Sequence, residues 1–206
     1  MSVGGELKAK RAIKKIEDKK REIASQAIDL MRETGYHNMS MDVVAERVGL
    51  TKPTLYSYIS SKQELLFYIL ESAMTSGTKS IKDIILQSKS ARIRLREALS
   101  AYVELILNNS NLFYSAFTEH NSLTDEHQLI IRKMQSEFLS LWKKLYEEGV
   151  LEGSFEKMPT KVAIQMLLGV MHWIPFWNRE GDKSDQEENL MRIVNFCEKG
   201  LLKKEE

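Results

Sequence analysis

Residues 51 to 58, TKPTLYSY, combine polar and aromatic side chains that suit hydrogen bonding to nucleic acid. On a helix, Leu55 and Ile59 lie four residues apart and face one side, which leaves the other side polar. That polar side consists of Lys52, Thr54, Ser57 and Tyr58, with Tyr56 at its edge. It offers hydroxyls, an ammonium group and aromatic edges but no carboxylate, and such groups can contact base edges and phosphates in a DNA groove.

The flanking residues predict that this helix is the second of a helix-turn-helix over residues 40 to 62. Ser40 can cap the first helix through its hydroxyl, and Gly49 can adopt the left-handed conformation that ends that helix. Thr51 can cap the second helix, and Pro53 falls in its first turn, where a missing N–H loses no hydrogen bond. Two helices joined by so short a turn are typical of DNA-binding proteins.

The start of the next helix offers a phosphate contact. Ser61 and Glu64 have the spacing of a capping box, and Lys62 lies beside the free N–H groups of the first turn. The alternative is a capping serine followed by a surface lysine. The predicted DNA-contacting residues are Ser40, Thr51, Lys52, Pro53, Thr54, Tyr56, Ser57, Tyr58 and Lys62.

The chain of 206 residues has a net charge of +1, but its charges are unevenly distributed. Residues 1 to 62 contain 12 Lys and Arg against 8 Asp and Glu, a net charge of +4, while the remainder contains 18 against 21, a net charge of −3. This asymmetry is expected of a DNA-binding domain attached to a near-neutral body. The basic residues between Lys8 and Arg21 could contact DNA phosphates or form a solvated helix end, and the sequence favours neither.

About residues 20 to 68 resemble the DNA-binding domain of the TetR family of bacterial and archaeal regulators. The matching residues are Arg21, Ile23, Ala27, Leu30, Gly35, Tyr36, Gly49, Thr54, Leu55, Tyr56, Ser61, Lys62, Glu64, Leu65 and Leu66. The chain departs from the family pattern at Pro53, where glycine is frequent, and at Tyr58 and Ile59, where histidine and phenylalanine are frequent.

The resemblance implies an all-α protein of two domains. Residues 1–62 would form an N-terminal three-helix helix-turn-helix domain that binds DNA, and residues 63–206 a C-terminal helical domain for effector binding and dimerisation. The resemblance further implies a homodimer that binds a palindromic double-stranded DNA operator as a repressor. A small hydrophobic effector would release it. We expect a cytoplasmic location, because the N-terminal residues lack the apolar core of a signal peptide.

Periodic apolar residues predict about nine helices in all. The first is expected at 8–34, two form the helix-turn-helix, and the others lie near 61–88, 90–108, 110–120, 124–149, 159–178 and 184–201. We expect Ile13 and Ile16 to face inward on the first helix, and Ile130 to do so on helix 124–149. Helix 61–88 should loosen around Thr75 to Gly77, where helix-forming residues are few.

The segment Val162 to Trp177 is apolar nearly all round, so it needs a partner on more than one side. A second copy of the chain could cover its outer face, together with the last helix, to form a four-helix dimer interface. The residues of the last helix expected in that interface are Leu190, Ile193, Val194 and Cys197. Pro175 should kink or end the segment.

Aromatic residues of the body could fill a core or line a cavity, and the TetR resemblance favours an effector cavity. The predicted ligand-binding residues are Tyr102, Phe113, Phe117, Trp142, Met166, Trp173, Trp177 and Arg179. The spacing of Trp173, Trp177, Arg179 and Gly181 resembles the C-terminal segment of the family's acyl-CoA-responsive regulators of fatty-acid breakdown. An acyl-CoA is therefore the first candidate effector, with Arg179 at its coenzyme A head.

Other functions remain as alternatives. One is a regulator of an efflux pump that senses an aromatic or cationic drug-like molecule, with Glu104 or Glu119 as the counter-charge. An enzyme is disfavoured, because the chain has no HExxH motif, no glycine-rich phosphate loop and no nucleophile motif. We therefore predict no catalytic residues, no metal and no cofactor, and we interpret the single cysteine, Cys197, as a core thiol.

The sequence also disfavours export and membrane association. No run approaches 18 apolar residues, and the N-terminal residues lack the apolar core of a signal peptide. A helical adaptor or membrane-surface protein would leave the polar face around Lys52 without a role.

Overall fold

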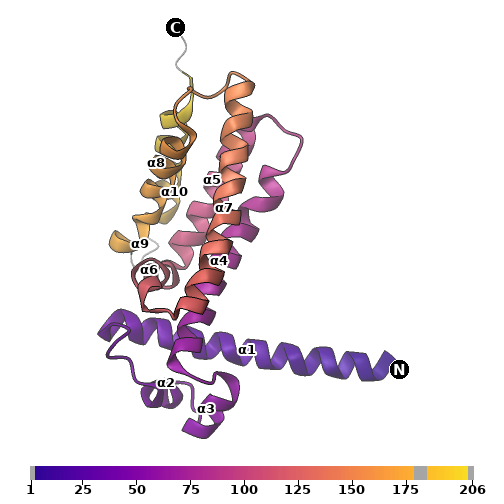
Figure 1. Ribbon diagram of the computed structural model, residues 1–206, viewed down its shortest axis with the longest axis vertical. Helices are drawn as coiled ribbons and strands as arrows, with labels where there is room; N and C mark the ends of the chain where they lie inside the picture. The colour runs from indigo at the N-terminus through magenta and orange to yellow at the C-terminus, as the bar shows by residue number, and fades with distance from the viewer. Residues whose placement is uncertain (1–2, 179–184, 204–206) are drawn as a thin grey trace.

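The computed structural model describes residues 3–178 and 185–203, which form a tall helical body on a smaller helical head (Figure 1). The helices are α1 Val3–Thr34, α2 Met41–Arg47, α3 Lys52–Tyr58, α4 Lys62–Ile85, α5 Ala91–Asn108, α6 Ser110–Thr118, the 3-10 turn η1 His120–Ser122, α7 Asp125–Leu151, α8 Thr160–His172, α9 Ile174–Trp177 and α10 Gln186–Leu201. Within these residues the only β pairing is an isolated bridge between Phe155 and Leu202. The predicted all-α fold is confirmed.

The head consists of α1, α2 and α3 around a compact apolar core that includes Ile23, Ala27, Val44 and Leu55. The predicted capping residues act as expected. Ser40 Oγ accepts the N–H of Asp42 at 3.2 Å, and Thr51 Oγ1 accepts the N–H of Thr54 at 3.4 Å. Gly49 has a φ of +65°, so it supplies the left-handed residue that turns the chain from α2 into α3.

Helix α4 belongs to both the head and the body (Figure 1). Leu66 and Ile69 are buried in the head, whereas Ile81 and Ile85 are buried in the body. The expected loosening before Gly77 is wrong, because α4 runs unbroken from Lys62 to Ile85. Gly77 instead permits a close approach, since a Cβ there would lie 3.2 Å from Cε2 of Tyr102.

The body packs α5 and α7 against α4, with α8 and α10 side by side along one flank (Figure 1). The predicted helix 159–178 is two helices. Helix α8 ends at His172 and α9 begins at Ile174, and Pro175 lies in the first turn of α9, where its missing N–H loses no bond. The predicted break at Pro175 is confirmed. Because of this break, the described residues form one α-helix more than the sequence indicated.

Two predicted faces are wrong. Ile13 and Ile16 are 62% and 46% exposed, because the first half of α1 extends beyond the head and meets no other helix (Figure 1). On α7, Ile130 is 40% exposed and its neighbour Ile131 is buried. A helix turns about 100° per residue, so Ile131 lies about 20° from the direction of Phe138, whereas Ile130 lies about 80° away.

Among the residues described, no helix combines the length and the apolar character needed to cross a membrane.

Candidate functional site

Helix α3 lies at the end of the head remote from the body and exposes most of its predicted polar face (Figure 1). Lys52, Thr54, Tyr56 and Ser57 are exposed, whereas Tyr58 is half-buried against the head core. Ser40, Thr51 and Pro53 are also exposed beside them. The structure therefore brings the predicted residues of the helix-turn-helix onto one surface, with Tyr58 at its inner edge.

This surface contains a carboxylate that the sequence did not reveal. Lys52 Nζ lies 2.9 Å from Oδ1 of Asp42, which belongs to the first turn of α2. The hydrogen bond to Asp42 raises the pKa of the Lys52 ammonium group. Both side chains are more than half exposed, so the pair is one that solvent and salt can weaken.

Lys62 lies on the first turn of α4 and is oriented by the turn that follows α1. Its Nζ donates to the carbonyl oxygen of His37 at 3.0 Å and lies 4.7 Å from the centroid of the Tyr36 ring. Partial burial lowers the pKa of this ammonium group. An ammonium group has three donors, so two remain for a phosphate once one is given to His37.

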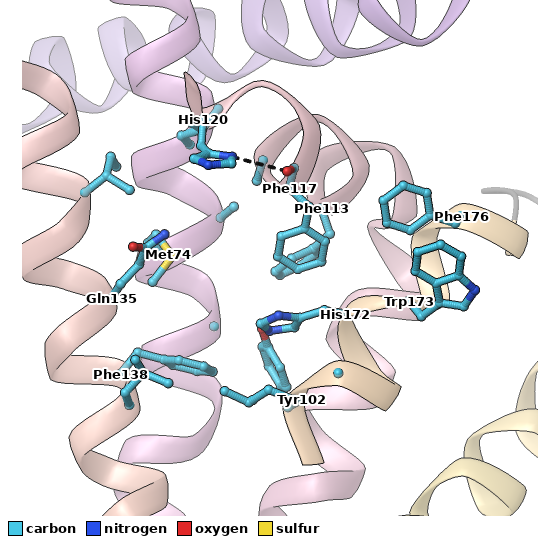
Figure 2. A pocket seen from close by; sticks show the side chains of 18 residues that line it. Met74, Tyr102, Phe113, Phe117, His120, Gln135, Phe138, His172, Trp173 and Phe176 are labelled. Atoms are coloured by element: carbon cyan, nitrogen blue, oxygen red, sulfur yellow. Dashed lines mark hydrogen bonds between the residues drawn. The ribbon is translucent and has the colours of Figure 1, made fainter. Parts of the chain in front are cut away.

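The body contains an apolar cavity of about 500 Å³, bounded by α4, α5, α6, α7, α8 and α9 (Figure 2). Its lining residues are Leu70, Ala73, Met74, Gly77, Tyr102, Phe113, Ala116, Phe117, His120, Ile131, Gln135, Phe138, Leu139, Leu168, Gly169, His172, Trp173 and Phe176. A volume of this size is within the range of small-molecule sites.

The cavity has a buried floor and an exposed mouth. Tyr102, Phe113 and Phe138 are buried, and Figure 2 shows their rings converging on the interior. At the mouth, Trp173 is 63% exposed and stacks on Phe176, with ring centroids 4.6 Å apart. The cavity is therefore open to solvent on the side of α9.

The predicted ligand-binding residues fall into three groups. Tyr102, Phe113, Phe117 and Trp173 line the cavity. Trp142 lies outside the lining but supports it, because its ring centroid is 6.3 Å from that of Tyr102. Met166 and Trp177 are 59% and 49% exposed and do not line the cavity, and Arg179 lies outside the described residues.

Met166 and Trp177 lie on exposed sides of their helices, where only residues near the mouth, such as Trp173, reach the cavity. On α8 the buried positions include Leu168 and Met171, and Met166 follows the exposed stripe that contains Val162 and Trp173. Apolar residues on both sides of α8 gave the sequence no means of choosing the inner side.

Several lining residues were missed, and two of them had a detectable signal. Phe138 lies four residues before Trp142, which places both on one side of α7. His172 is one of two polar residues in the apolar segment from Val162 to Trp177, and such a residue usually has a buried partner. That partner is Tyr102, whose hydroxyl lies 3.1 Å from Nε2 of His172.

Burial changes the ionisation of this Tyr102–His172 pair. It lowers the pKa of the His172 imidazole to about 4, and it raises the pKa of the Tyr102 hydroxyl above its usual range. Both side chains are therefore neutral near pH 7. The part of the cavity lining that the structure describes contains no Asp, Glu, Lys or Arg.

Comparison with known proteins identifies the chain. Residues 23–69 match the family described as bacterial regulatory proteins, tetR family, and residues 88–201 match the tetracyclin repressor-like C-terminal domain. The second match alone covers more than half of the 206 residues. The chain belongs to the TetR family.

Individual TetR-family relatives are distant in sequence. The fatty acid metabolism regulator protein of Bacillus subtilis (strain 168) is 22% identical over 176 residues, covering 84% of this chain and 89% of the relative. The transcriptional activator FasR of Mycolicibacterium smegmatis is 22% identical over 187 residues, covering 90% and 84%. A solved structure of AibR in complex with isovaleryl coenzyme A and operator DNA is 22% identical and has a TM-score of 0.75, covering 86% and 96%.

The members of this family are transcriptional regulators, so the chain is a regulator rather than an enzyme. Among the described residues, no group of three or more His, Cys, Asp or Glu is placed to hold a metal ion. Cys197 is buried, and burial raises the pKa of its thiol to about 11, which disfavours the reactive thiolate.

The depressed pKa of His172 predicts a dependence of stability on pH. The unfolded imidazole binds a proton below about pH 6.5, whereas the folded one does so only near pH 4. The free energy of unfolding should therefore have its full value above pH 6.5. It should fall by up to about 3 kcal/mol as the pH drops toward 4. Chemical denaturation of the wild type and of His172→Phe across this range measures the effect. Parallel curves for the two proteins would contradict it.

Proposed function

We propose that the protein is a homodimeric repressor that binds a palindromic DNA operator and is released by a small hydrophobic effector, with an acyl-CoA as the first candidate. The main support is a shared wall between the two parts of the molecule. Leu70 and Ile131 line the cavity and also belong to the apolar core of the head. An effector in the cavity would therefore contact residues on which the geometry of the head depends.

The DNA contacts are proposed to come from the exposed surface of α3, the caps of both helices and Lys62. The full set is Ser40, Thr51, Lys52, Pro53, Thr54, Tyr56, Ser57, Tyr58 and Lys62. The two heads of a dimer would need to lie about one DNA turn apart, roughly 34 to 36 Å, to occupy both half-sites. The double-stranded operator can be obtained by selecting bound fragments from random or genomic DNA.

Substitutions on this surface should change the affinity for DNA by different routes. Lys52→Ala and Tyr56→Phe should each cost about 1 to 3 kcal/mol of operator binding. Lys62→Ala should weaken all DNA sequences equally and reduce the salt dependence by about one unit of slope. Asp42→Asn should strengthen binding at low salt, because it frees Lys52 and removes a negative charge.

These affinities can be measured by fluorescence anisotropy at several salt concentrations. Lys157→Ala is the matched control, because Lys157 is exposed and lies in the connection between α7 and α8, at the far end of the body. Unchanged affinity in Lys52→Ala, Tyr56→Phe and Lys62→Ala would place the DNA interface elsewhere.

The proposed dimer interface lies on the outer sides of α8 and α10. The large apolar residues exposed on these helices are Val162, Met166 and Trp173 along and just after α8, and Met191 and Phe196 on α10. The α10 face expected from the sequence is wrong, because Val194 and Cys197 are buried in the body and Leu190 and Ile193 pack against its core. A few hundred Å² of such surface, buried at about 25 cal/mol per Å², would favour association by several kcal/mol before the entropy of association is deducted.

A charge at the centre of that face should dissociate the dimer. Met166 is 59% exposed and lies outside the cavity lining, so Met166→Glu should give monomers without altering the ligand site. Leu151→Glu is the matched control, because Leu151 is 87% exposed at the end of α7. Light scattering at micromolar concentration measures the mass. A wild-type monomer would contradict the proposed dimer.

The character of the cavity favours an acyl group over a cationic effector. The lining, over residues 3–178 and 185–203, has no carboxylate to balance a cation. Glu104 is exposed and Glu119 accepts a hydrogen bond from Ser122 Oγ at 3.1 Å, and neither lines the cavity. The names of the Bacillus regulator and of the AibR complex point in the same direction. The efflux-pump alternative would require a neutral aromatic effector.

Coupling to DNA is proposed to pass through contacts between α1 and the helices at the cavity mouth. The guanidinium of Arg32 lies 3.9 Å from the centroid of the Tyr114 ring on α6, and it donates to the carbonyl oxygen of Pro175 at 3.4 Å. Phe176, the next residue, lines the cavity. A change at the mouth would thus be transmitted to α1, which supports the helix-turn-helix.

Removing this contact should reduce the response to the effector without removing effector binding. In the wild type, acyl-CoAs of some chain length should release the operator. In Arg32→Gln the acyl-CoA affinity should stay within about twofold, while the coupling free energy should fall by about 0.5 to 2 kcal/mol. Calorimetry and anisotropy measure the two quantities, with Arg132→Gln as a control on the exposed side of α7.

If acyl-CoAs neither release DNA nor raise the melting temperature, the acyl-CoA assignment is wrong and the DNA-binding proposal is unaffected. If acyl-CoA releases the operator from Arg32→Gln as fully as from the wild type, the effect of the ligand reaches the head through contacts other than that of Arg32.

A further inference from the structure

The floor of the cavity contains one polar contact among aromatic rings. Tyr102 from α5 and His172 from the end of α8 meet inside the cavity, with the Tyr102 hydroxyl 3.1 Å from His172 Nε2 (Figure 2). Among the residues described, neither side chain makes a second hydrogen bond. The other polar side chains of the lining include Gln135 and His120, both of which are exposed.

Packing fixes both rings in this position. The Tyr102 ring centroid lies 5.2 Å from that of Phe138 and 6.1 Å from that of Phe113, and the absence of a Cβ at Gly77 makes room for its edge. The His172 ring lies 4.4 Å from that of Phe117. The two polar groups therefore cannot turn away to solvent without disturbing the aromatic floor.

The pair always has one donor left over. A neutral imidazole has one N–H and a phenol has one O–H, so the pair has two donors and its internal bond uses one. If His172 Nε2–H donates to Tyr102, the Tyr102 O–H remains free for a ligand. If Tyr102 donates instead, the Nδ1–H of His172 remains. A spare Tyr102 O–H that faces the apolar cavity needs an acceptor, because a buried donor left unpaired costs about 1 to 3 kcal/mol.

The acceptor must be neutral. Among the residues described, the lining contains no Lys or Arg to balance a carboxylate and no Asp or Glu to balance a cation. The imidazole stays uncharged near pH 7, because burial lowers its pKa to about 4. A buried charge on the ligand would therefore lack a partner of opposite sign.

We infer that Tyr102 and His172 form a polar anchor that selects effectors with a neutral hydrogen-bond acceptor between apolar groups, such as the carbonyl oxygen of a thioester or a ketone. This inference rests on the proposed function, because it concerns the same cavity. It specifies which atom of the effector is recognised at depth, whereas the acyl-CoA proposal concerns the molecule as a whole. The carbonyl oxygen accepts from Tyr102, and the proton on His172 Nε2 holds the hydroxyl in the donating orientation.

Matched ligand pairs isolate the carbonyl group. The first pair is isovaleryl-CoA or hexadecanoyl-CoA and its thioether, in which CH₂ replaces the C=O and the rest is unchanged. The second pair is acetophenone and isopropylbenzene, which have similar shape and no coenzyme A. The wild type should bind the thioester about tenfold more tightly than the thioether, and acetophenone should raise the melting temperature more than isopropylbenzene does.

Three variants test the residues. Tyr102→Phe should bring the thioester preference to within about twofold of unity while leaving thioether affinity unchanged. His172→Gln, which retains a donor and an acceptor, should keep more of the preference than His172→Phe. Tyr114→Phe is the matched control, because Tyr114 lies on α6 outside the cavity lining and should keep the full preference. Circular dichroism and operator binding verify that each variant is folded.

The outcomes distinguish the anchor from the proposed function. If thioester and thioether bind the wild type equally, or if Tyr102→Phe keeps the preference, the anchor is wrong and the effector proposal stands. If neither CoA compound binds but acetophenone is preferred in a manner that depends on Tyr102, the anchor stands and the acyl-CoA assignment is wrong. If neither pair binds the wild type, the inference is overturned.

Discussion

The structure depends on a wall that the ligand cavity and the DNA-binding head have in common. Leu70 of α4 and Ile131 of α7 are buried in the head core and also line the cavity. Protein interiors are close-packed and yield little when a neighbouring space is filled. A ligand in the cavity would therefore contact residues that also belong to the head core.

Helix α4 runs unbroken from Lys62 to Ile85, and it contributes both Leu70 and Gly77 to the wall of the cavity. The glycine has a steric role, since its missing Cβ allows Tyr102 to lie against α4 at the cavity floor. The same residue that lowers the helix propensity of α4 thus shapes the ligand site while the surrounding packing keeps the helix intact.

The sequence predicted best the features that depend on neighbours in the chain. The helix-turn-helix is defined by two capping hydroxyls, a left-handed glycine and a proline in a first turn, and each acts within four residues of itself. The pairing of Lys52 with Asp42 escaped prediction because it joins two helices, and their approach is set by the packing of the head core.

The cavity was predicted less completely, since an aromatic residue can face a cavity, a filled core or solvent with the same sequence pattern. Trp142, Met166 and Trp177 illustrate the difficulty, because all three are suitable lining residues and none lines the cavity. His172 gave a clearer signal than any of them. A polar residue in an apolar helix needs a partner, and the search for that partner leads to Tyr102.

The mouth of the cavity and the proposed dimer interface meet on α8. Gly169 and Trp173 line the cavity and also lie on the exposed side of this helix, and nothing lies within 4 Å of a Cβ built at Gly169. In the proposed dimer the partner would pack beside Trp173 and hold it against Phe176, so assembly would restrict the aromatic pair through which a ligand enters. Binding equilibria that share a residue in this way are linked, and linkage is reciprocal. The proposed dimer would thus alter the affinity for the effector, and the effector would alter the stability of the dimer by the same free energy, independently of any contact with DNA.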